Sequence, residues 1–376
     1  MTIFSLDEAE LRQRRSLKWR TFEPDVLPLW VAEMDVRMLP AVRAELTAAL
    51  EASDTGYPHG TGYADAYRES AAARWGLELE PRQVINGGDV MNAIACVLEA
   101  VTDPGDGIVI TTPVYAPFWQ VSGGYRRRTV AVPLTADHRL DLEALAAAFA
   151  PDDVTAFILC SPHNPTGTVH TADELAAVAE LCDAHGVQLI VDEIHAWLVD
   201  PGTPFVPALA VPEARNAMVI VSAGKSWNLA AFKAGLYVAG AGAQPLLGRL
   251  PPLATQSTGH LGAIAHTAAL RHGQDWVDAV CAEVAGHKQL LADLLHALVP
   301  GAGYRPAPGT YLAWVDCSAL GLDDPFAHFL KRGRVAFSPG RVFSPRHQQW
   351  VRINLAASPA MITQAVERMA DSLRHR

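Results

Sequence analysis

Lys225 is a charged residue in a part of the sequence where burial is expected. It ends the segment Ser222-Ala-Gly-Lys225, directly after the apolar run AMVIV (217–221), so it stands at the end of a predicted buried strand. Burial disfavours the cationic form of a lysine and lowers its pKa. A neutral amine is the form that reacts with an aldehyde to give a Schiff base. The alternative is a lysine that extends from the sheet edge and keeps its charge in water.

Asp192 is a second polar residue that follows an apolar run. It comes directly after VQLIV (187–191) and begins the segment Asp192-Glu-Ile-His195. A carboxylate at that depth needs a cationic or strongly donating partner. A protonated pyridine nitrogen is such a partner, and an acid there keeps the ring an electron sink. The alternatives are a helix cap or a structural ion pair for Asp192, and a packing role for His195.

Two further apolar runs end in sharp turns. The run VTAFILC (154–160) is followed by SPHNPTG (161–167), in which two prolines and a glycine fix a turn that presents Asn164 rigidly. The amide of Asn164 can donate there to a phenolate oxygen. Gly87-Gly88-Asp89-Val90 follows another strand and opens a helix, whose free N–H groups and dipole suit a phosphate. Taken singly, each segment is also compatible with an ordinary turn.

These four clusters need elements that bring them together. Between about residues 46 and 240, short apolar runs alternate with helical patterns, which predicts an α/β fold with a mostly parallel central sheet and helices on both faces. One helix is marked at both ends, because Thr171 and Glu174 form a capping box and Gly186 stops it. Ligands of such sheets bind beyond the carboxyl ends of the strands.

The pattern changes after about residue 275. A long amphipathic helix is predicted from Trp276, and the strands beyond it are fewer and more widely separated, which indicates a smaller α+β domain. We therefore expect three parts. Residues 1–45 form an N-terminal segment that covers the site and joins the small domain, 46–275 the large ligand-binding domain, and 276–376 the small C-terminal domain.

Composition excludes several classes of protein. The 376 residues carry a formal net charge of −10 with scattered basic residues, so we expect no nucleic-acid partner. The five cysteines are an odd number without a CxxC pair, which indicates reduced residues rather than a disulfide or metal framework. The N-terminus lacks the apolar core of a secretory signal, and no apolar run reaches the ~20 residues that span a bilayer. We expect a soluble, cytoplasmic protein.

The order and spacing of the clusters resemble those of fold-type I enzymes that depend on pyridoxal phosphate (PLP), in the class I/II aminotransferase superfamily. Within it, the chain is similar to the MalY/PatB group of cystathionine β-lyase-like C–S lyases. The similarity runs nearly end to end. Its motifs are WVAEMD (30–35), TPVYAPF (112–118), SPHNPTG (161–167), VDEIH (191–195) and SAGKSWNLA (222–230).

The resemblance implies catalytic roles for three residues. Lys225 would be the Schiff-base lysine and the proton shuttle, Asp192 the partner of the pyridine nitrogen, and Tyr115 the aromatic side chain stacked on the pyridine face. Asn164 would donate to the ring oxygen O3′. The whole cofactor-binding set implied in this way is Gly88, Asp89, Val90, Tyr115, Asn164, Asp192, His195, Ser222, Lys225, Lys233 and Tyr57 of the partner subunit.

Two residues depart from the pattern of the phosphate site. Many aminotransferases carry an arginine eight residues after the Schiff-base lysine, where this chain has Lys233, which supplies charge without a bidentate fork. Asp89 places a carboxylate where the phosphate dianion is expected. We expect its side chain to turn outward, so that only its N–H is used.

Substrate contacts also follow from the resemblance. Arg352 would bind the substrate carboxylate through two parallel hydrogen bonds, with Trp30 and Asn164 beside it. The alternative for Arg352 is a surface ion pair. A tyrosine of one subunit that reaches the phosphate of the other implies a homodimer with shared active sites.

Three functions are compatible with these residues. The resemblance favours a β-lyase that cleaves cystathionine or another L-cysteine S-conjugate to a thiol, pyruvate and ammonia. An aminotransferase of the class I/II type is the alternative, because the two reactions share their first steps. A PLP-binding regulatory or partner-binding protein with little turnover is the third, and the presence of Lys225, Asp192, Asn164 and Arg352 argues against it.

Overall fold

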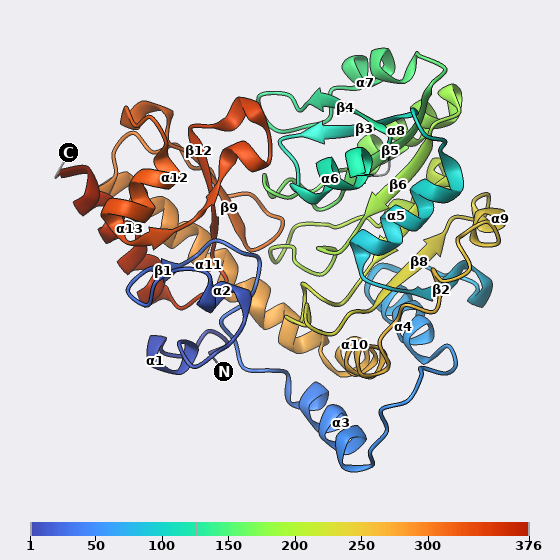
Figure 1. The fold of residues 1–376 in the computed structure, drawn as a ribbon, viewed down its shortest axis with the longest axis horizontal. Coiled ribbons are helices and arrows are strands. Elements are labelled where there is room, and N and C mark those ends of the chain that lie inside the picture. The colour runs from blue at the N-terminus through green and yellow to red at the C-terminus, as the bar shows by residue number, and fades with distance from the viewer. Residues whose placement is uncertain (1, 125, 375–376) are drawn as a thin grey trace.

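The larger part of the molecule is built on a seven-stranded sheet, in a computed structural model that describes residues 2–124 and 126–374. The strand order is β2-β8-β7-β6-β5-β3-β4 (Figure 1). Neighbouring strands pair in parallel, except that β8 is antiparallel to both β7 and β2. The strands are β2 (Val84–Gly87), β3 (Gly107–Thr112), β4 (Arg128–Pro133), β5 (Val154–Cys160), β6 (Gln188–Asp192), β7 (Met218–Val221) and β8 (Gly235–Ala239).

Helices cover both faces of this sheet, because successive residues of each strand point in opposite directions. In β5, Ile158 belongs to the core that contains α5 (Val90–Val101), α6 (Pro117–Gly124) and α9 (Gln244–Leu247). Its neighbour Phe157 belongs to the core on the opposite face. The expected mostly parallel sheet with helices on both faces is confirmed. The second core includes α3 (Pro40–Glu51), α4 (Gly62–Trp75), α7 (Leu142–Phe149), α8 (Ala172–His185) and α10 (His260–His272).

Helix α8 has the ends that its sequence predicts. Glu174 N–H donates to Thr171 Oγ1 over 3.2 Å, and Thr171 N–H donates to Glu174 Oε2 over 2.8 Å. Gly186 ends the helix in the left-handed conformation, with φ of 66°. Such an N-cap stabilises a helix by about 1 kcal/mol, and it fixes the register of α8 between β5 and β6.

The smaller part contains a three-stranded antiparallel sheet with the order β11-β12-β9. A short α-helix over Pro325–His328 continues as one turn of π-helix over Phe329–Gly333. The elements of this part are β9 (Leu312–Asp316), α12 (Pro325–His328), β10 (Val335–Ala336), β11 (Ser338–Pro339), β12 (Trp350–Asn354) and α13 (Pro359–Arg374).

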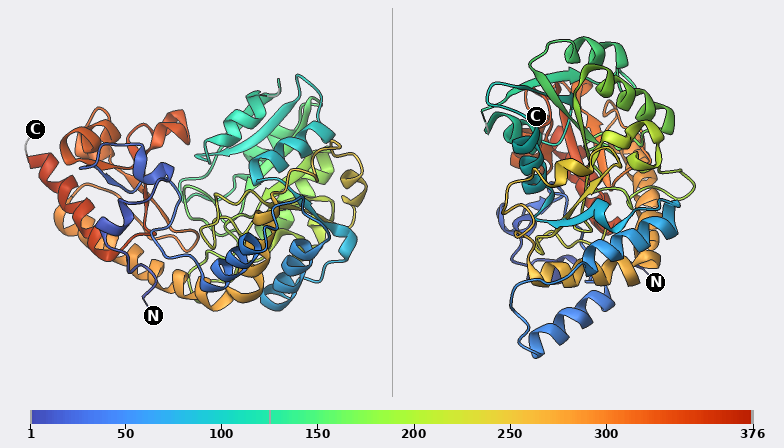
Figure 2. Two further views of the ribbon diagram at one scale, coloured as in Figure 1. Left: turned by 60° about the horizontal axis from the view of Figure 1, so that its bottom comes forward. Right: turned by 90° about the vertical axis from the view of Figure 1, so that its right-hand side faces the viewer.

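Two segments join the parts. Helix α11 (Gln274–Leu298) runs along both, as Figure 2 shows: its residue Val277 lies in the core of the large part and Leu291 in that of the small part. The N-terminal segment adds β1 (Leu27–Pro28), which pairs in parallel with β10, and the helices α1 (Glu8–Leu11) and α2 (Leu17–Arg20). Residues 30–35 of this segment, which we call the strap, pass from the small part to the large one.

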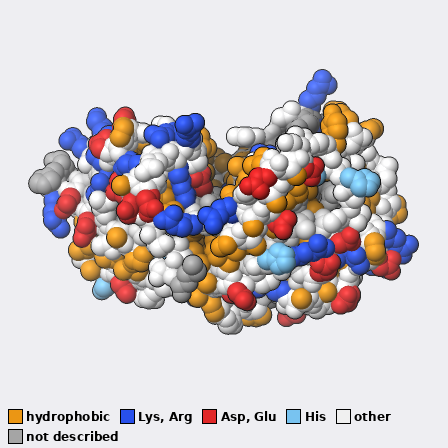
Figure 3. Space-filling model, turned by 90° about the horizontal axis from the view of Figure 1, so that it is seen from below, with side chains coloured by type: hydrophobic (Ala, Val, Ile, Leu, Met, Phe, Trp, Pro, Cys, Tyr) orange, Lys and Arg blue, Asp and Glu red, His pale blue; other side chains and the backbone are white. Residues whose placement is uncertain are grey.

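One face of the molecule shows how charged side chains are distributed. Seen from below, acidic and basic side chains are interspersed and the outline is hollowed between the two parts (Figure 3). Within the described residues, no helix has the length and apolar character needed to cross a membrane.

Candidate active site

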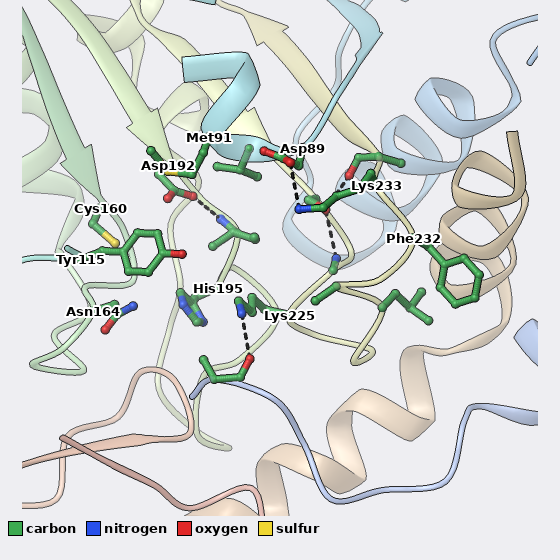
Figure 4. Close-up of a pocket in the computed structure, with 18 residues that line it drawn as sticks. Asp89, Met91, Tyr115, Cys160, Asn164, Asp192, His195, Lys225, Phe232 and Lys233 are labelled. Atoms are coloured by element: carbon green, nitrogen blue, oxygen red, sulfur yellow. Dashed lines mark hydrogen bonds and ion pairs between the residues drawn. The ribbon is translucent and has the colours of Figure 1, made fainter. Parts of the chain in front are cut away.

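A cavity of about 140 Å³ lies at the carboxyl ends of β5, β6 and β7, next to the N-terminus of α5. Figure 4 shows the side chains that converge there. The cavity lies where the sequence places it, because parallel strands end at the same edge of a sheet. The predicted residues that line it are Asp89, Val90, Tyr115, Asn164, Asp192, His195, Ser222, Lys225 and Lys233.

Other lining residues were not singled out from the sequence. Cys160 is the last residue of β5 and pairs in register with Asp192, so the predicted strand ends already contained the signal that could have found it. Ala32 lies in the strap, where Trp30 is the predicted site residue. Met91, Ile194 and Phe232 also line the cavity, and nothing in their local sequence distinguishes them from core residues.

The amine of Lys225 lies inside this cavity. Its Nζ donates a hydrogen bond to the backbone oxygen of Ala32 over 2.7 Å. Burial and the positive charge of Arg352 lower the pKa of Lys225 to about 8, although the carboxylates of Glu33 and Asp192 act to raise it. A substantial neutral fraction therefore exists near physiological pH, which is what attack on an aldehyde requires.

This lowered pKa gives a testable prediction. We expect a small aliphatic aldehyde, trapped by borohydride, to label Lys225 at a rate that rises with pH and has a midpoint near 8. The labelling rate rises with pH because only the deprotonated amine reacts, and the fraction of that form grows as the pH passes the pKa. Mass spectrometry of the labelled peptides measures the rate. The exposed Lys331 is the internal control, and equal pH profiles for the two lysines would contradict the prediction.

Asp192 is buried at the end of β6. The N–H of Ile194 donates to its Oδ1 over 3.0 Å. Burial raises the pKa of Asp192 to about 7, against that hydrogen bond and the charge of Lys225, which lower it. Such a carboxyl is stabilised in its ionised form when a cation comes into contact with it. A protonated ring nitrogen fits that requirement.

Arg352 is buried next to Asn164 rather than exposed at the surface, so the alternative of a surface ion pair is wrong. Its Nη1 donates to Asn164 Oδ1 over 2.9 Å, and its Nη2 donates to the backbone oxygen of Trp30 over 3.0 Å. The guanidinium also lies 4.7 Å from the centre of the Phe343 ring. Burial lowers the pKa of Arg352 to about 10, so the group stays cationic at neutral pH.

Two buried nitrogens near the cavity are available to bind a ligand. Among the described residues, His195 Nδ1 and Arg352 Nε have no hydrogen-bond partner. Burial and the charges of Lys225 and Arg352 lower the pKa of His195 to about 3, so its ring is neutral. Unpaired buried polar groups are costly, and a ligand that supplies partners removes the cost. Together with Asp192 and Lys225, these atoms fit the PLP and amino-acid substrate expected from the resemblance.

The phosphate site differs from the expectation at Asp89. Its side chain does not turn outward: it lines the cavity, where Oδ1 accepts from the N–H of Asn92 over 3.0 Å and Oδ2 pairs with Lys233 Nζ at 2.9 Å. A helix N-cap draws its side chain toward the first turn, which is the physical reason. Ser222 Oγ donates to the backbone oxygen of Ala234 over 2.8 Å, so its proton already has a partner.

Gly88 itself does not line the cavity, but it is tightly enclosed. A Cβ atom there would come within 2.7 Å of both Asn92 Oδ1 and Ser257 Oγ. A side chain at this position would therefore displace the ends of the Asn92 and Ser257 side chains. Tyr57 lies outside the cavity with 97% of its surface exposed.

The strap is held by side chains from both parts of the molecule. Asn354 Nδ2 donates to the backbone oxygens of Val31 and Glu33 over 2.8 and 2.7 Å. The indole of Trp30 does not line the cavity; its Nε1 donates to the backbone oxygen of Lys18 over 3.3 Å. What this residue offers to the site is its backbone oxygen, which Arg352 binds.

A mostly parallel sheet whose strand ends bring a lysine of lowered pKa, a buried aspartate and a helix N-terminus into one cavity defines an α/β enzyme of the reactive-lysine type. The sequence also shows the family to which the chain belongs. The Aminotransferase class I and II family matches residues 24–369, and the chain belongs to that family.

Relatives and solved structures agree with the group that the motifs indicated. The chain is 45% identical over 390 residues to a Mycobacterium tuberculosis protein named "Putative cystathionine beta-lyase", with 97% of this chain and 96% of that protein covered. It is 29% identical to the Bacillus subtilis protein named "Cystathionine beta-lyase PatB", covering 96% and 97%. A Corynebacterium diphtheriae structure titled "putative plp-dependent beta-cystathionase" matches with a TM-score of 0.94, 28% identity and full coverage of both chains.

Proposed function

We propose that this protein is a PLP-dependent carbon–sulfur β-lyase that cleaves cystathionine or another L-cysteine S-conjugate to a thiol, pyruvate and ammonia. The observation that carries the proposal is end-to-end similarity to proteins named cystathionine β-lyase, combined with a cavity that retains the reactive lysine and the buried aspartate. PLP supplies an electrophilic carbon for the substrate amine and a ring that delocalises the electron pair left at Cα.

The residues of the chain would divide the work among them. Arg352 binds the substrate carboxylate, for which its unpaired Nε is available, and Asn164 holds the guanidinium in place. Lys225 in its amine form takes the Cα proton, and the Ala32 oxygen fixes the position of that amine. Asp192 keeps the ring nitrogen protonated. Departure of the thiolate from Cβ, which takes up a proton to become the thiol, completes an elimination, and water then hydrolyses the released enamine to pyruvate and ammonia.

A coupled assay tests the reaction. Purified protein with PLP and L-cystathionine is expected to release pyruvate and a free thiol in equal amounts without a keto acid. Activity that appears only when a keto acid is added would make the protein an aminotransferase, the alternative that its family also contains. Bound PLP with neither activity would indicate a regulatory or partner-binding role.

Arg352 is expected to act mainly on substrate affinity. Arg352→Lys keeps the positive charge but loses the planar fork, so we expect KM to rise roughly 10- to 100-fold with a smaller change in kcat. Arg341→Lys is the matched control, because Arg341 is an exposed arginine of the small part that pairs with Asp324. An unchanged KM in the Arg352 variant would contradict the assignment.

We also propose a homodimer in which the partner subunit's Tyr57 reaches the phosphate. Such a role is consistent with the exposed tyrosine of the single chain. Sedimentation equilibrium is expected to give twice the mass of one chain, and a monomer with full activity would contradict the proposal.

We further propose that the chain divides into residues 1–45, 46–275 and 276–376. We also propose a cytoplasmic location, because the five cysteines are unpaired.

A further inference from the structure

The ion pair between Asp89 and Lys233 has no role in the chemistry proposed above, although both residues line the cavity. Their carboxylate and ammonium atoms lie 2.9 Å apart, and the two residues are 144 positions apart in the sequence. Figure 4 shows the pair beside the start of α5. It therefore lies at the end of the cavity where a phosphate is expected to bind.

Asp89 also occupies one of the free backbone N–H groups at the N-terminus of α5. Its Oδ1 accepts the N–H of Asn92, one of the donors that the first turn of α5 leaves free. Burial acts to raise the pKa of Asp89, but the hydrogen bonds from Asn92 and Lys233 outweigh it and leave the pKa below its ordinary value. The residue is consequently anionic at neutral pH, next to a site for a dianion.

We propose that Asp89 lowers the affinity of this site for the phosphate of PLP, by neutralising Lys233 and by placing its own negative charge at the N-terminus of α5. The inference rests on the proposed function, since it concerns the cofactor of that function. Two charges a few ångströms apart at a partly exposed site interact appreciably. The non-covalent contribution of the phosphate to cofactor binding is then smaller, because the positive charge that would bind it is already paired.

The charges of the pair set the order of affinities among variants. The pair has zero net charge in the natural chain, +1 in Asp89→Asn, −1 in Lys233→Met and zero again in the double variant. Affinity for a dianion follows that order, so the double variant should resemble the natural chain. Asn is as good an N-cap as Asp, so Asp89→Asn keeps the cap of α5 and changes only the charge.

The probe is pyridoxamine phosphate, which carries the ring and the phosphate but no aldehyde. It cannot bond covalently to Lys225, so its dissociation constant, measured by isothermal titration calorimetry on the cofactor-free chain, reports non-covalent affinity. Asp89→Asn is expected to lower this constant about tenfold and Lys233→Met to raise it about tenfold. The double variant is expected to remain within about threefold of the natural chain.

Two controls make the result specific. Pyridoxamine, which lacks the phosphate, should bind the natural chain and Asp89→Asn equally. Asp141→Asn makes the same change at the N-cap of α7, where Oδ1 accepts from the N–H of Ala144 over 2.9 Å, and should leave the affinity for pyridoxamine phosphate unchanged. Thermal melts identify a misfolded variant, and Asp89→Ser, which keeps a cap oxygen, then replaces Asp89→Asn.

The outcomes separate this inference from the proposed function. If Asp89→Asn weakens binding or leaves it unchanged, Asp89 serves only to hold Lys233 toward the phosphate or only to cap the helix, and the inference is overturned while the lyase proposal stands. If the natural chain binds neither pyridoxamine phosphate nor PLP, both proposals are overturned. Tighter binding that appears equally with pyridoxamine would also contradict the inference, because the effect would not act on the phosphate.

Discussion

Replacing Lys225 with alanine is expected to lower kcat for pyruvate release from L-cystathionine by at least about 10⁴-fold. Both the attachment of the cofactor and the removal of the Cα proton would depend on this one amine. No other lysine among the residues that line the cavity can replace it at Cα, since Lys233 is paired with Asp89 at the phosphate end. Steady-state and single-turnover assays measure the loss.

The control for this variant is a lysine of the same chain in an exposed position. Lys331→Ala should keep full activity, because Lys331 lies at the surface of the small part, away from the cavity. Small primary amines added to Lys225→Ala are expected to restore part of the rate, as a diffusing base can remove the same proton. A Lys225→Ala variant with more than about a hundredth of the original kcat would contradict the assignment.

Asp192→Asn is expected to lower kcat about 10³-fold while leaving PLP bound. The amide has nearly the same shape as the carboxyl group but cannot balance a protonated ring nitrogen. Removing one partner of a buried ion pair costs several kcal/mol, which sets the size of the effect. The measurement is kcat in the lyase assay, with the absorbance spectrum of the bound cofactor as a second reading.

Glu193→Gln is a close control for that substitution. Glu193 is the next residue and is also buried, but its Oε1 accepts the N–H of Ala208 and it does not line the cavity. Burial raises the pKa of Glu193 to about 8, so the glutamine resembles the neutral form that prevails at pH 7. Equal losses of activity in the two variants would show that the effect at Asp192 is a general one on the fold.

The strap connects Arg352, the proposed substrate-binding arginine, with Lys225. Arg352 donates a hydrogen bond to the backbone oxygen of Trp30, and Lys225 donates one to that of Ala32. Asn354 donates to two further backbone oxygens of the strap. A substrate carboxylate bound by Arg352, as proposed, would therefore act on the same segment that contacts the lysine amine. The N-terminal segment is therefore part of the site rather than only its cover.

The sequence by itself predicted the alternation of strands and helices in the large part and the strand ends that carry its polar groups. Local periodicity and capping residues are sufficient for this, because they depend on neighbours within a few positions; the capping box of Thr171 and Glu174 is one example. The carboxyl ends of parallel strands lie at one edge of the sheet, so the sequence alone is sufficient to predict that Asn164, Asp192 and Lys225 lie together. The antiparallel strand β8 was not singled out, since its short apolar run GLYVA has no flanking signal of direction.

Only the tertiary structure decided which polar groups pair and what charge they carry. Asn164 binds Arg352 from 188 positions away, Asp89 binds Lys233 from 144, and Lys225 binds Ala32 from 193. Such pairings depend on how whole domains pack, and the pKa of each group depends on the burial and charges that this packing creates. Lys225 could be recognised from the end of its strand, but its pKa near 8 follows from burial, Arg352 and the folded strap.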